Sequence, residues 1–286
     1  MHCPPYCPLP TPLRVLRREG ALALAALLLG VLALVAPALQ QAAHYHDFAD
    51  QRAWDALPHA LDVLSNVPFA LWGLAGLAVL ARVLQLRAID CTLAGLAALF
   101  FVGLIVTAGV SSYYHWQPDD AGLVWDRAGM VLAFAGLLGL AAVQAVSPRA
   151  GVALALAVLL LGLASVRVWA VSGNFLPWAL LQGGSMVFIL LVACLRPVCP
   201  ESGLPIRWAL VIALYALAKV LELADRPVFE LTGQWISGHS FKHLVASFAA
   251  WPVLLAVKAA VAAAERRFES SAKSALPFLS AGPASL

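Results

Sequence analysis

Eight apolar stretches of about 20 residues constrain the fold of this chain more than any other feature. A helix of about 20 apolar residues is long enough to cross the ~30 Å hydrocarbon core of a bilayer. Charged residues make up 12% of the 286 residues, whereas soluble domains contain roughly 25%. We therefore predict an all-α, polytopic membrane helix bundle with spans at approximately 21–39, 63–84, 93–115, 122–146, 151–171, 175–195, 206–224 and 240–262.

The basic residues are distributed unevenly between the two sides of this predicted bundle. If the spans alternate in direction, one side carries Arg14, Arg17, Arg18, Arg82, Arg87, Arg149, Arg196, Arg207, Lys258, Arg266, Arg267 and Lys273. The other side carries only Arg52, Arg127, Arg167, Arg226 and Lys242. Because cytoplasmic loops are rich in Lys and Arg, both termini are predicted to be cytoplasmic, in a cell (inner) membrane protein. Loops 40–60, 116–121 and 225–238 are then outside.

The spans divide the chain into four segments. Residues 1–20 are predicted to form a cytoplasmic tail, and 21–39 an additional N-terminal transmembrane helix. A basic tail, an apolar run and the sequence Ala36-Pro37-Ala38 also fit a signal peptide with its cleavage site, and this alternative stays open. Residues 40–262 form the predicted seven-helix domain. Residues 263–286, rich in Ser, Ala and Pro, are predicted to be a disordered cytoplasmic tail.

Polar residues gather on the predicted outer face, where six of the seven histidines lie. The residues concerned are His44, His46, Asp47, Asp50, Asp55, His59, His115, Asp119, Asp120, Asp126, Asp225, Glu230, His239 and His243. Ionisable groups at membrane depth are costly and point to function. Two further polar pairs lie within spans. In the first pair, Lys219 and Glu222 are predicted to interact with each other. Asp62 and Asn66, four residues apart, are predicted to line a cavity or hold a metal-binding histidine.

A metal site is predicted from three histidines. His239 and His243 in "GHSFKH" are four residues apart, the spacing with which two imidazoles on one helix face share a metal ion. With His115, they would leave a fourth position open, as in catalytic zinc sites. Ser111 lies one turn before His115 on the same face. Asp126 opens the next helix after a short loop and is predicted at the same membrane depth as His115, where its carboxylate can accept a proton from water. Alternatively, the rings bond interfacial water, Ser111 bonds the backbone, and Asp126 is a solvated helix-start carboxylate.

These motifs resemble a known group of membrane hydrolases. "SSYYH", "WD" with its aspartate eleven residues after that histidine, "GHSFKH" and "DVLSNVPFALWG" occur in order between residues 44 and 262. The pattern is similar to the CREST superfamily, and most similar to its alkaline ceramidase family in the bacterial branch. The resemblance implies a seven-helix bundle with Zn²⁺ held by His115, His239 and His243. It implies Asp126 as general base and Ser111 as the residue that steadies the oxyanion or the water.

The implied reaction is hydrolysis of a lipid amide to a fatty acid and a sphingoid base. The Ala- and Arg-rich, Lys-poor composition is typical of a bacterium of high G+C content, so the membrane lipid substrate is either ceramide or a related N-acyl lipid. Eukaryotic alkaline ceramidases also have an acidic, Ca²⁺-binding loop that ends in a glutamate, and here His59 occupies that position. Asp47, Asp50 and Asp55 upstream leave the question of Ca²⁺ open.

Two other functions fit parts of the pattern. A receptor or sensor would keep a zinc site for structure alone, and an ion transporter would use outward-facing histidines and carboxylates. Transport is disfavoured because the inner halves of the spans are nearly free of polar residues. Retention of Asp126 and Ser111 beside the histidines favours an enzyme, since structural zinc requires neither. The net charge of +3 is small and says nothing about nucleic acid; no nucleic-acid partner is expected for this membrane bundle.

Overall fold

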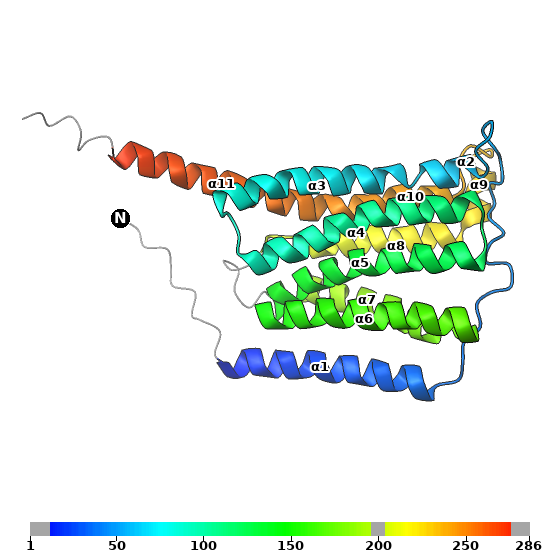
Figure 1. Cartoon of the computed structure of the whole chain (residues 1–286), viewed down its shortest axis with the longest axis horizontal. Coiled ribbons are helices and arrows are strands. Elements are labelled where there is room, and N and C mark those ends of the chain that lie inside the picture. Colours follow the sequence, from blue (N-terminus) through cyan, green and yellow to red (C-terminus); the bar gives the residue numbers. More distant parts are fainter. Residues whose placement is uncertain (1–11, 196–203, 276–286) are drawn as a thin grey trace, which may run out of the picture.

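The chain folds into a bundle of α-helices (Figure 1). The computed structural model describes residues 12–195 and 204–275. Their helices are α1 (Pro12–Val35), α2 (Ala60–Leu64), α3 (Val67–Leu86), α4 (Cys91–Trp116), α5 (Asp120–Ala145), α6 (Pro148–Ser172), α7 (Leu176–Cys194), α8 (Trp208–Leu223), α9 (Asp225–Leu231), α10 (Gly238–Ser247) and α11 (Trp251–Ala275), with a 3₁₀ turn at Phe248–Ala250. No strand forms in these residues, so the predicted all-α class is confirmed.

Seven segments within the described residues are long and apolar enough to cross a membrane. They contain α1, α2 with α3, α4, α5, α6, α7, and α10 with α11. The remaining predicted span, 206–224, forms α8, whose 16 residues extend about 24 Å at 1.5 Å per residue. The chain is therefore a polytopic membrane protein, and α8 is a shorter helix within the bundle, packed against α7 and α10.

Side-chain caps mark where several of these helices begin. The carboxylates of Asp90 and Asp119 accept hydrogen bonds from the first main-chain N–H groups of α4 and α5. The hydroxyls of Ser147 and Ser237 do the same for α6 and α10. Such caps satisfy donors that have no partner inside the helix. They set the start of α5 and α10, two helices that carry predicted site residues.

Close packing of α4 against α5 sets the register between two predicted site helices. A Cβ atom at Gly103 would lie 2.4 Å from the main-chain nitrogen of Ala133, and one at Gly136 would lie 2.3 Å from that of Phe100. Only glycine allows the two backbones to approach this closely. Toward the histidine-bearing end of α4, Gly122 faces Tyr114, and Gly129 faces Thr107. The two helices are thus antiparallel, with the C-terminal end of α4 beside the N-terminal end of α5.

Helix α1 lies at the edge of the bundle (Figure 1), where it packs against α7, and none of its residues is buried. It begins at Pro12, nine residues before the predicted start. The polar residues that precede the apolar run continue the helix, because Arg and Leu are good helix formers. Two contacts attach this end to the bundle: Arg18 donates to the main-chain oxygen of Ala145 at 2.6 Å, and Ser147 donates to Glu19 at 2.5 Å.

The prediction of a disordered tail from residue 263 is wrong for residues 263–275, which continue α11. Their Ala, Glu, Arg and Lys content favours helix, and a helix already anchored in the bundle extends without a new nucleation step. Residues 276–286 lie outside the described part of the chain. The Pro12 end of α1 and the Ala275 end of α11 lie at the same end of the bundle in Figure 1.

Candidate metal centre

Three histidines from two helices converge at the end of the bundle where α2 and α9 lie. His115 comes from the last turn of α4, and His239 and His243 project from one face of α10. All three are buried, with 1%, 6% and 6% of their surfaces exposed. The Nε2 atoms of His115 and His239 are 3.2 Å apart, and one nitrogen from each ring lies within 4.8 Å of the others. The structure therefore assembles the predicted histidine cluster.

The donor set of this cluster fits a metal ion. Two nitrogens bound at 2.0–2.1 Å to one tetrahedral ion lie about 3.3 Å apart, close to the His115–His239 separation of 3.2 Å. The Nδ1 atom of His115 is buried without a hydrogen-bond partner among the described residues. The cluster is the only group of three or more His, Cys, Asp or Glu side chains in the described chain that can hold a metal ion.

Ser65 contacts the ring of His243. The Ser65 hydroxyl oxygen lies 2.8 Å from Nδ1 of His243 and 3.0 Å from the main-chain oxygen of Asp62. A metal ion bound at Nε2 of His243 would leave the ring proton on Nδ1, where it would be donated to the Ser65 oxygen, while the Ser65 proton goes to Asp62. Outer hydrogen bonds of this kind orient metal-binding histidines.

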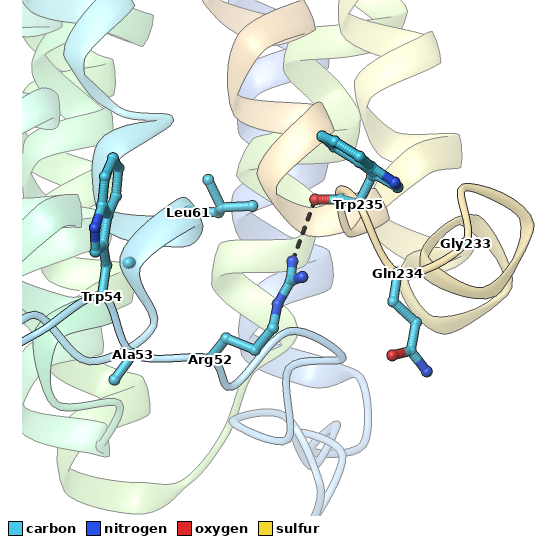
Figure 2. Close-up of a pocket in the computed structure, with 8 residues that line it drawn as sticks. Arg52, Ala53, Trp54, Leu61, Gly233, Gln234 and Trp235 are labelled. Carbon is cyan, nitrogen blue, oxygen red and sulfur yellow. Dashed lines mark hydrogen bonds between the residues drawn. The ribbon is translucent and has the colours of Figure 1, made fainter.

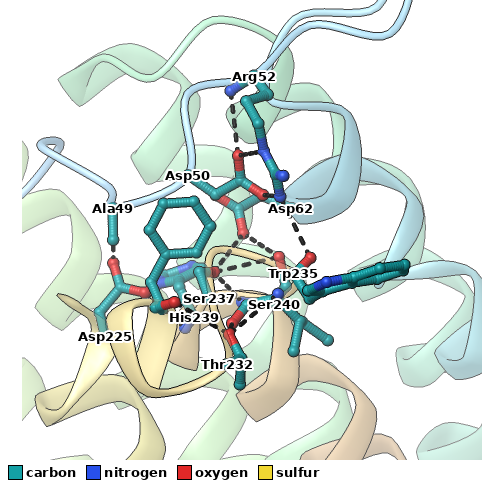
Figure 3. Close-up of polar contacts among 12 residues, drawn as sticks. Ala49, Asp50, Arg52, Asp62, Asp225, Thr232, Trp235, Ser237, His239 and Ser240 are labelled. Atoms are coloured by element: carbon teal, nitrogen blue, oxygen red, sulfur yellow. Dashed lines mark hydrogen bonds and ion pairs between the residues drawn. The ribbon is translucent and has the colours of Figure 1, made fainter. Parts of the chain in front are cut away.

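Asp62 holds the start of α10 and forms no hydrogen bond with a histidine of the described chain. It is fully buried, and its Oδ1 accepts hydrogen bonds from Ser240 at 2.5 Å and Ser237 at 3.4 Å (Figure 3). The amide of Asn66 donates to the main-chain oxygen of Asp62. The predicted role of supporting a metal-binding histidine thus belongs to Ser65, while Asp62 fixes the helix that carries His239 and His243.

Asp225, which the sequence places on the polar face without a specific role, is a positioning residue. Its two carboxylate oxygens accept hydrogen bonds from the main-chain nitrogens of His239, at 2.8 Å, and Ala49, at 2.9 Å (Figure 3). One carboxylate therefore connects the first turn of α10 to the long loop that precedes α2. Asp225 is the first residue of α9 and lies fourteen positions before His239, so no helical spacing relates the two.

The same loop covers the histidines with an aromatic ring. The buried ring of Phe48 lies 4.2 Å from the ring of His239 and 4.8 Å from that of His115, centre to centre. His46 fastens the loop nearby, with one nitrogen 2.8 Å from the Tyr114 hydroxyl and the other 3.0 Å from the Asp120 carboxylate. Phe48 thus separates the cluster from the loop surface.

Arg127 anchors the beginning of this loop. Its guanidinium donates to Gln41 and is 1% exposed. It lies among aromatic rings, with its central carbon 4.2 Å from the ring centre of Trp169 and 4.9 Å from that of Phe175. Cation–π contacts of this kind compensate a buried cation for part of its lost hydration. Arg127 therefore holds the loop to α5, to the C-terminal end of α6 and to the N-terminal end of α7.

Two of the three loop carboxylates that left Ca²⁺ open are paired with basic side chains. Asp47 pairs with His44 at 2.9 Å, and Asp50 pairs with Arg52 at 2.7 Å. Burial alone would raise the pKa of Asp50, but the hydrogen bonds from Arg52 outweigh it and hold the pKa below its usual value. Asp55 is exposed. No group of three ligand side chains forms in this loop within the described residues, and Ca²⁺ has no part in the function proposed below.

Ser111 and Asp126 lie beside each other, one helical turn from His115 along α4. The Asp126 carboxylate neighbours the Ser111 hydroxyl, and Ser111 is 3% exposed. The α4–α5 register gives the reason, because Asp126 is midway between two glycines that face Tyr114 and Thr107. The sequence predicts Asp126 at the same depth in the bundle as His115. The packing of α4 against α5 places it at the depth of Ser111 instead.

Three charged residues from α8 and α10 form a cluster. The predicted Lys219–Glu222 pair forms, and Glu222 also accepts a hydrogen bond from Lys242 at 2.7 Å. Lys242 immediately precedes His243 and is close enough to interact electrostatically with Asp126. The sequence analysis assigned it no role. Pairing with Glu222 lowers the cost of placing both lysines in an apolar bundle.

A cavity of about 480 Å³ opens at the same end of the bundle, beside the start of α2. It is lined by Arg52, Ala53, Trp54, Ala60, Leu61, Gly233, Gln234 and Trp235 (Figure 2). Trp54 and Trp235 are largely exposed on its two sides. Arg52 spans it and donates to the main-chain oxygen of Trp235 at 3.2 Å. The cavity therefore lies between the loop that precedes α2 and the connection from α9 to α10, next to the residues that support α10.

Comparison with known proteins adds no assignment, because neither a protein-family model nor a curated protein matches the chain.

Proposed function

We propose that the protein is a zinc-dependent integral-membrane hydrolase that cleaves the amide bond of ceramide or a related N-acyl lipid. The observation that carries the proposal is the buried cluster of His115, His239 and His243 at one end of an apolar bundle. The resemblance of the sequence motifs to alkaline ceramidases supports the same reaction. The products would be a fatty acid and a sphingoid base or another amine.

Zinc is the metal that this donor set favours. Imidazole nitrogens suit zinc, and three protein ligands with a fourth position open are the arrangement of catalytic zinc sites. Bound there, the ion would supply a water of lowered pKa and would polarise the amide carbonyl. The chain would contribute neutral imidazoles, and the Ser65 oxygen, 2.8 Å from Nδ1 of His243, would accept the proton that binding through Nε2 leaves on Nδ1.

Asp126 and Ser111 would perform the remaining chemistry. The Asp126 carboxylate would accept the proton of the attacking water and pass it to the leaving amine. The Ser111 hydroxyl would donate a hydrogen bond to the oxyanion or steady the water. Their position one turn deeper than His115 places them on the hydrocarbon side of the cluster. A lipid amide would therefore lie between the histidines and these two side chains.

The covering of the site favours a substrate from the bilayer. Phe48 and the loop held by Asp225 and Arg127 lie over the histidines on the outer side. This cover would limit bulk water and water-soluble amides. The long acyl chains of an N-acyl lipid already lie at the depth of the spans, so such a molecule needs no passage through the aqueous loops.

The proposed orientation places the site near the outer face of a cell membrane. Both ends of the described chain lie at the end of the bundle remote from the histidines (Figure 1), and most basic residues lie there too. By the positive-inside rule that end is cytoplasmic. The enzyme would then act on lipids of the outer leaflet.

A receptor or sensor with a structural metal is the second candidate, favoured by the closure of the site. A structural metal needs no path for a substrate, and here the histidines are at most 6% exposed beneath Phe48. This candidate predicts a metal but no turnover.

The test is an assay of purified protein against a panel of ceramides and other long-chain N-acyl lipids. The proposal predicts fatty-acid release that a chelator stops and added Zn²⁺ restores. Water-soluble short-chain amides serve as the control substrates. Metal-containing protein that releases no fatty acid from any lipid of the panel would favour the receptor.

A further inference from the structure

A groove between α3 and α11 lies far from the histidine cluster. Its volume is about 390 Å³, and it is lined by Ala78, Val79, Arg82, Lys258, Val261, Ala262 and Glu265. The lining positions recur every three to four residues on each helix, so each helix presents one continuous face. Figure 1 shows α3 and α11 side by side along this part of the bundle. The groove thus has small apolar walls with charged side chains among them.

The depth of the groove matches a headgroup boundary. Arg82 lies about 22 Å along α3 from Val67, the residue that begins this helix next to the Ser65 contact with His243. The hydrocarbon core is about 30 Å thick. With the histidines near one face of the bilayer, Arg82 and Lys258 lie near the opposite face. Basic side chains at this depth reach the lipid phosphates through their flexible stems.

The charges that line the groove leave one positive charge in excess. The Arg82 guanidinium contacts Glu265 at 3.2 Å, and both side chains are about half exposed. Such an exposed pair is weak, so the guanidinium remains available to another acceptor. Lys258 has no carboxylate within ion-pair distance among the described residues. An anion at this position would therefore meet two cations and one carboxylate.

We propose that this groove binds the phosphate of an anionic phospholipid, with an acyl chain along the apolar walls formed by Ala78, Val79, Val261 and Ala262. Basic pockets between transmembrane helices on the cytoplasmic side are suited to anionic headgroups. The planar guanidinium of Arg82 offers two parallel donors to a phosphate, and Lys258 adds a point charge. A zwitterionic lipid gains less binding free energy, because the positive charge of its headgroup is repelled by the same basic side chains. The site is independent of the proposed hydrolase.

The test is native mass spectrometry of delipidated full-length protein in detergent, titrated separately with phosphatidylglycerol and phosphatidylcholine. We expect preferential retention of phosphatidylglycerol. One cation near an anionic lipid contributes roughly fivefold in binding, so R82Q with K258Q should reduce retention by about 20-fold or more. The control is R149Q with R207Q, which removes two exposed cations of the same predicted side away from the groove.

Equal retention of the two lipids by the wild-type protein would overturn the proposal without any variant. So would unchanged phosphatidylglycerol binding in the double variant. A third titration distinguishes the lipid from free phosphate: inorganic phosphate at the same concentration should neither bind nor displace phosphatidylglycerol. Displacement by inorganic phosphate would show an anion site without lipid specificity, contrary to the proposal.

Discussion

The Ser65 hydroxyl oxygen lies 2.8 Å from Nδ1 of His243 while its proton is donated to the main-chain oxygen of Asp62. This contact orients one ring of the cluster for binding a metal ion through Nε2. Ser65 and Asp62 belong to the α2 region, and His243 belongs to α10. The geometry of the cluster therefore depends on side chains far from the histidines in sequence.

The first prediction concerns Ser65→Ala, which removes the acceptor for Nδ1 of His243. Losing such an outer hydrogen bond typically lowers metal affinity by roughly 10- to 100-fold. Competition with a chelator of known affinity measures the change in purified protein. Ser185→Ala is the matched control, because the Ser185 hydroxyl only donates to the main-chain oxygen of Leu181. Equal metal affinity in Ser65→Ala and the wild type would show that the contact does not support the site.

The second prediction concerns Asp126→Asn. An amide cannot accept the proton of the attacking water, and general-base catalysis contributes roughly 10²- to 10⁴-fold. Turnover of the N-acyl lipid should fall by that factor, while the metal content stays unchanged because Asp126 is not a metal ligand. Asp120→Asn, at a largely exposed carboxylate, is the control. Full turnover in Asp126→Asn would remove Asp126 from the mechanism and leave the hydrolase standing.

The third prediction separates two neighbouring serines. Removal of one oxyanion donor lowers kcat by roughly 10²-fold or more, and Ser111→Ala should show such a loss with little change in KM. The hydroxyl of Ser112 instead donates to the main-chain oxygen of Val63 at 3.1 Å, so Ser112→Ala should keep most of its activity. Steady-state kinetics on one lipid substrate compares the two variants. Equal kcat values would exclude Ser111 from the chemistry.

The fourth prediction concerns orientation in the membrane. In whole cells, an impermeant thiol reagent should label Asp120→Cys, at the outer end of α5, and should not label Ser270→Cys in α11. Both substitutions are made in a chain whose native cysteines have been replaced. The opposite labelling pattern would place the histidine end in the cytoplasm.

Much of the fold could be predicted because span length and hydropathy depend on local sequence. The predicted boundaries of α4 and α5 agree with the structure to within two residues. Helix α1 and the end of α11 are longer than predicted, because helix propensity extends a helix past the apolar residues that mark a span. Hydropathy alone does not record that extension.

The histidine cluster was predictable because i, i+4 spacing places His239 and His243 on one face. The depth of Asp126 was not, because it depends on the register that Gly103 and Gly136 impose between α4 and α5. The roles of Phe48 and Asp225 were missed for a related reason. They arise from a loop folding back over the bundle, and neither residue belongs to a periodic pattern.

The central claim is that His115, His239 and His243 hold one zinc ion, and elemental analysis of purified protein tests it most directly. Wild-type protein should contain one zinc per chain, and His243→Ala should lose most of it, because one of three protein ligands is gone. His44→Ala is the matched control, since His44 is largely exposed and pairs only with Asp47; it should keep its zinc. Equal zinc content in the wild type and His243→Ala would contradict the account.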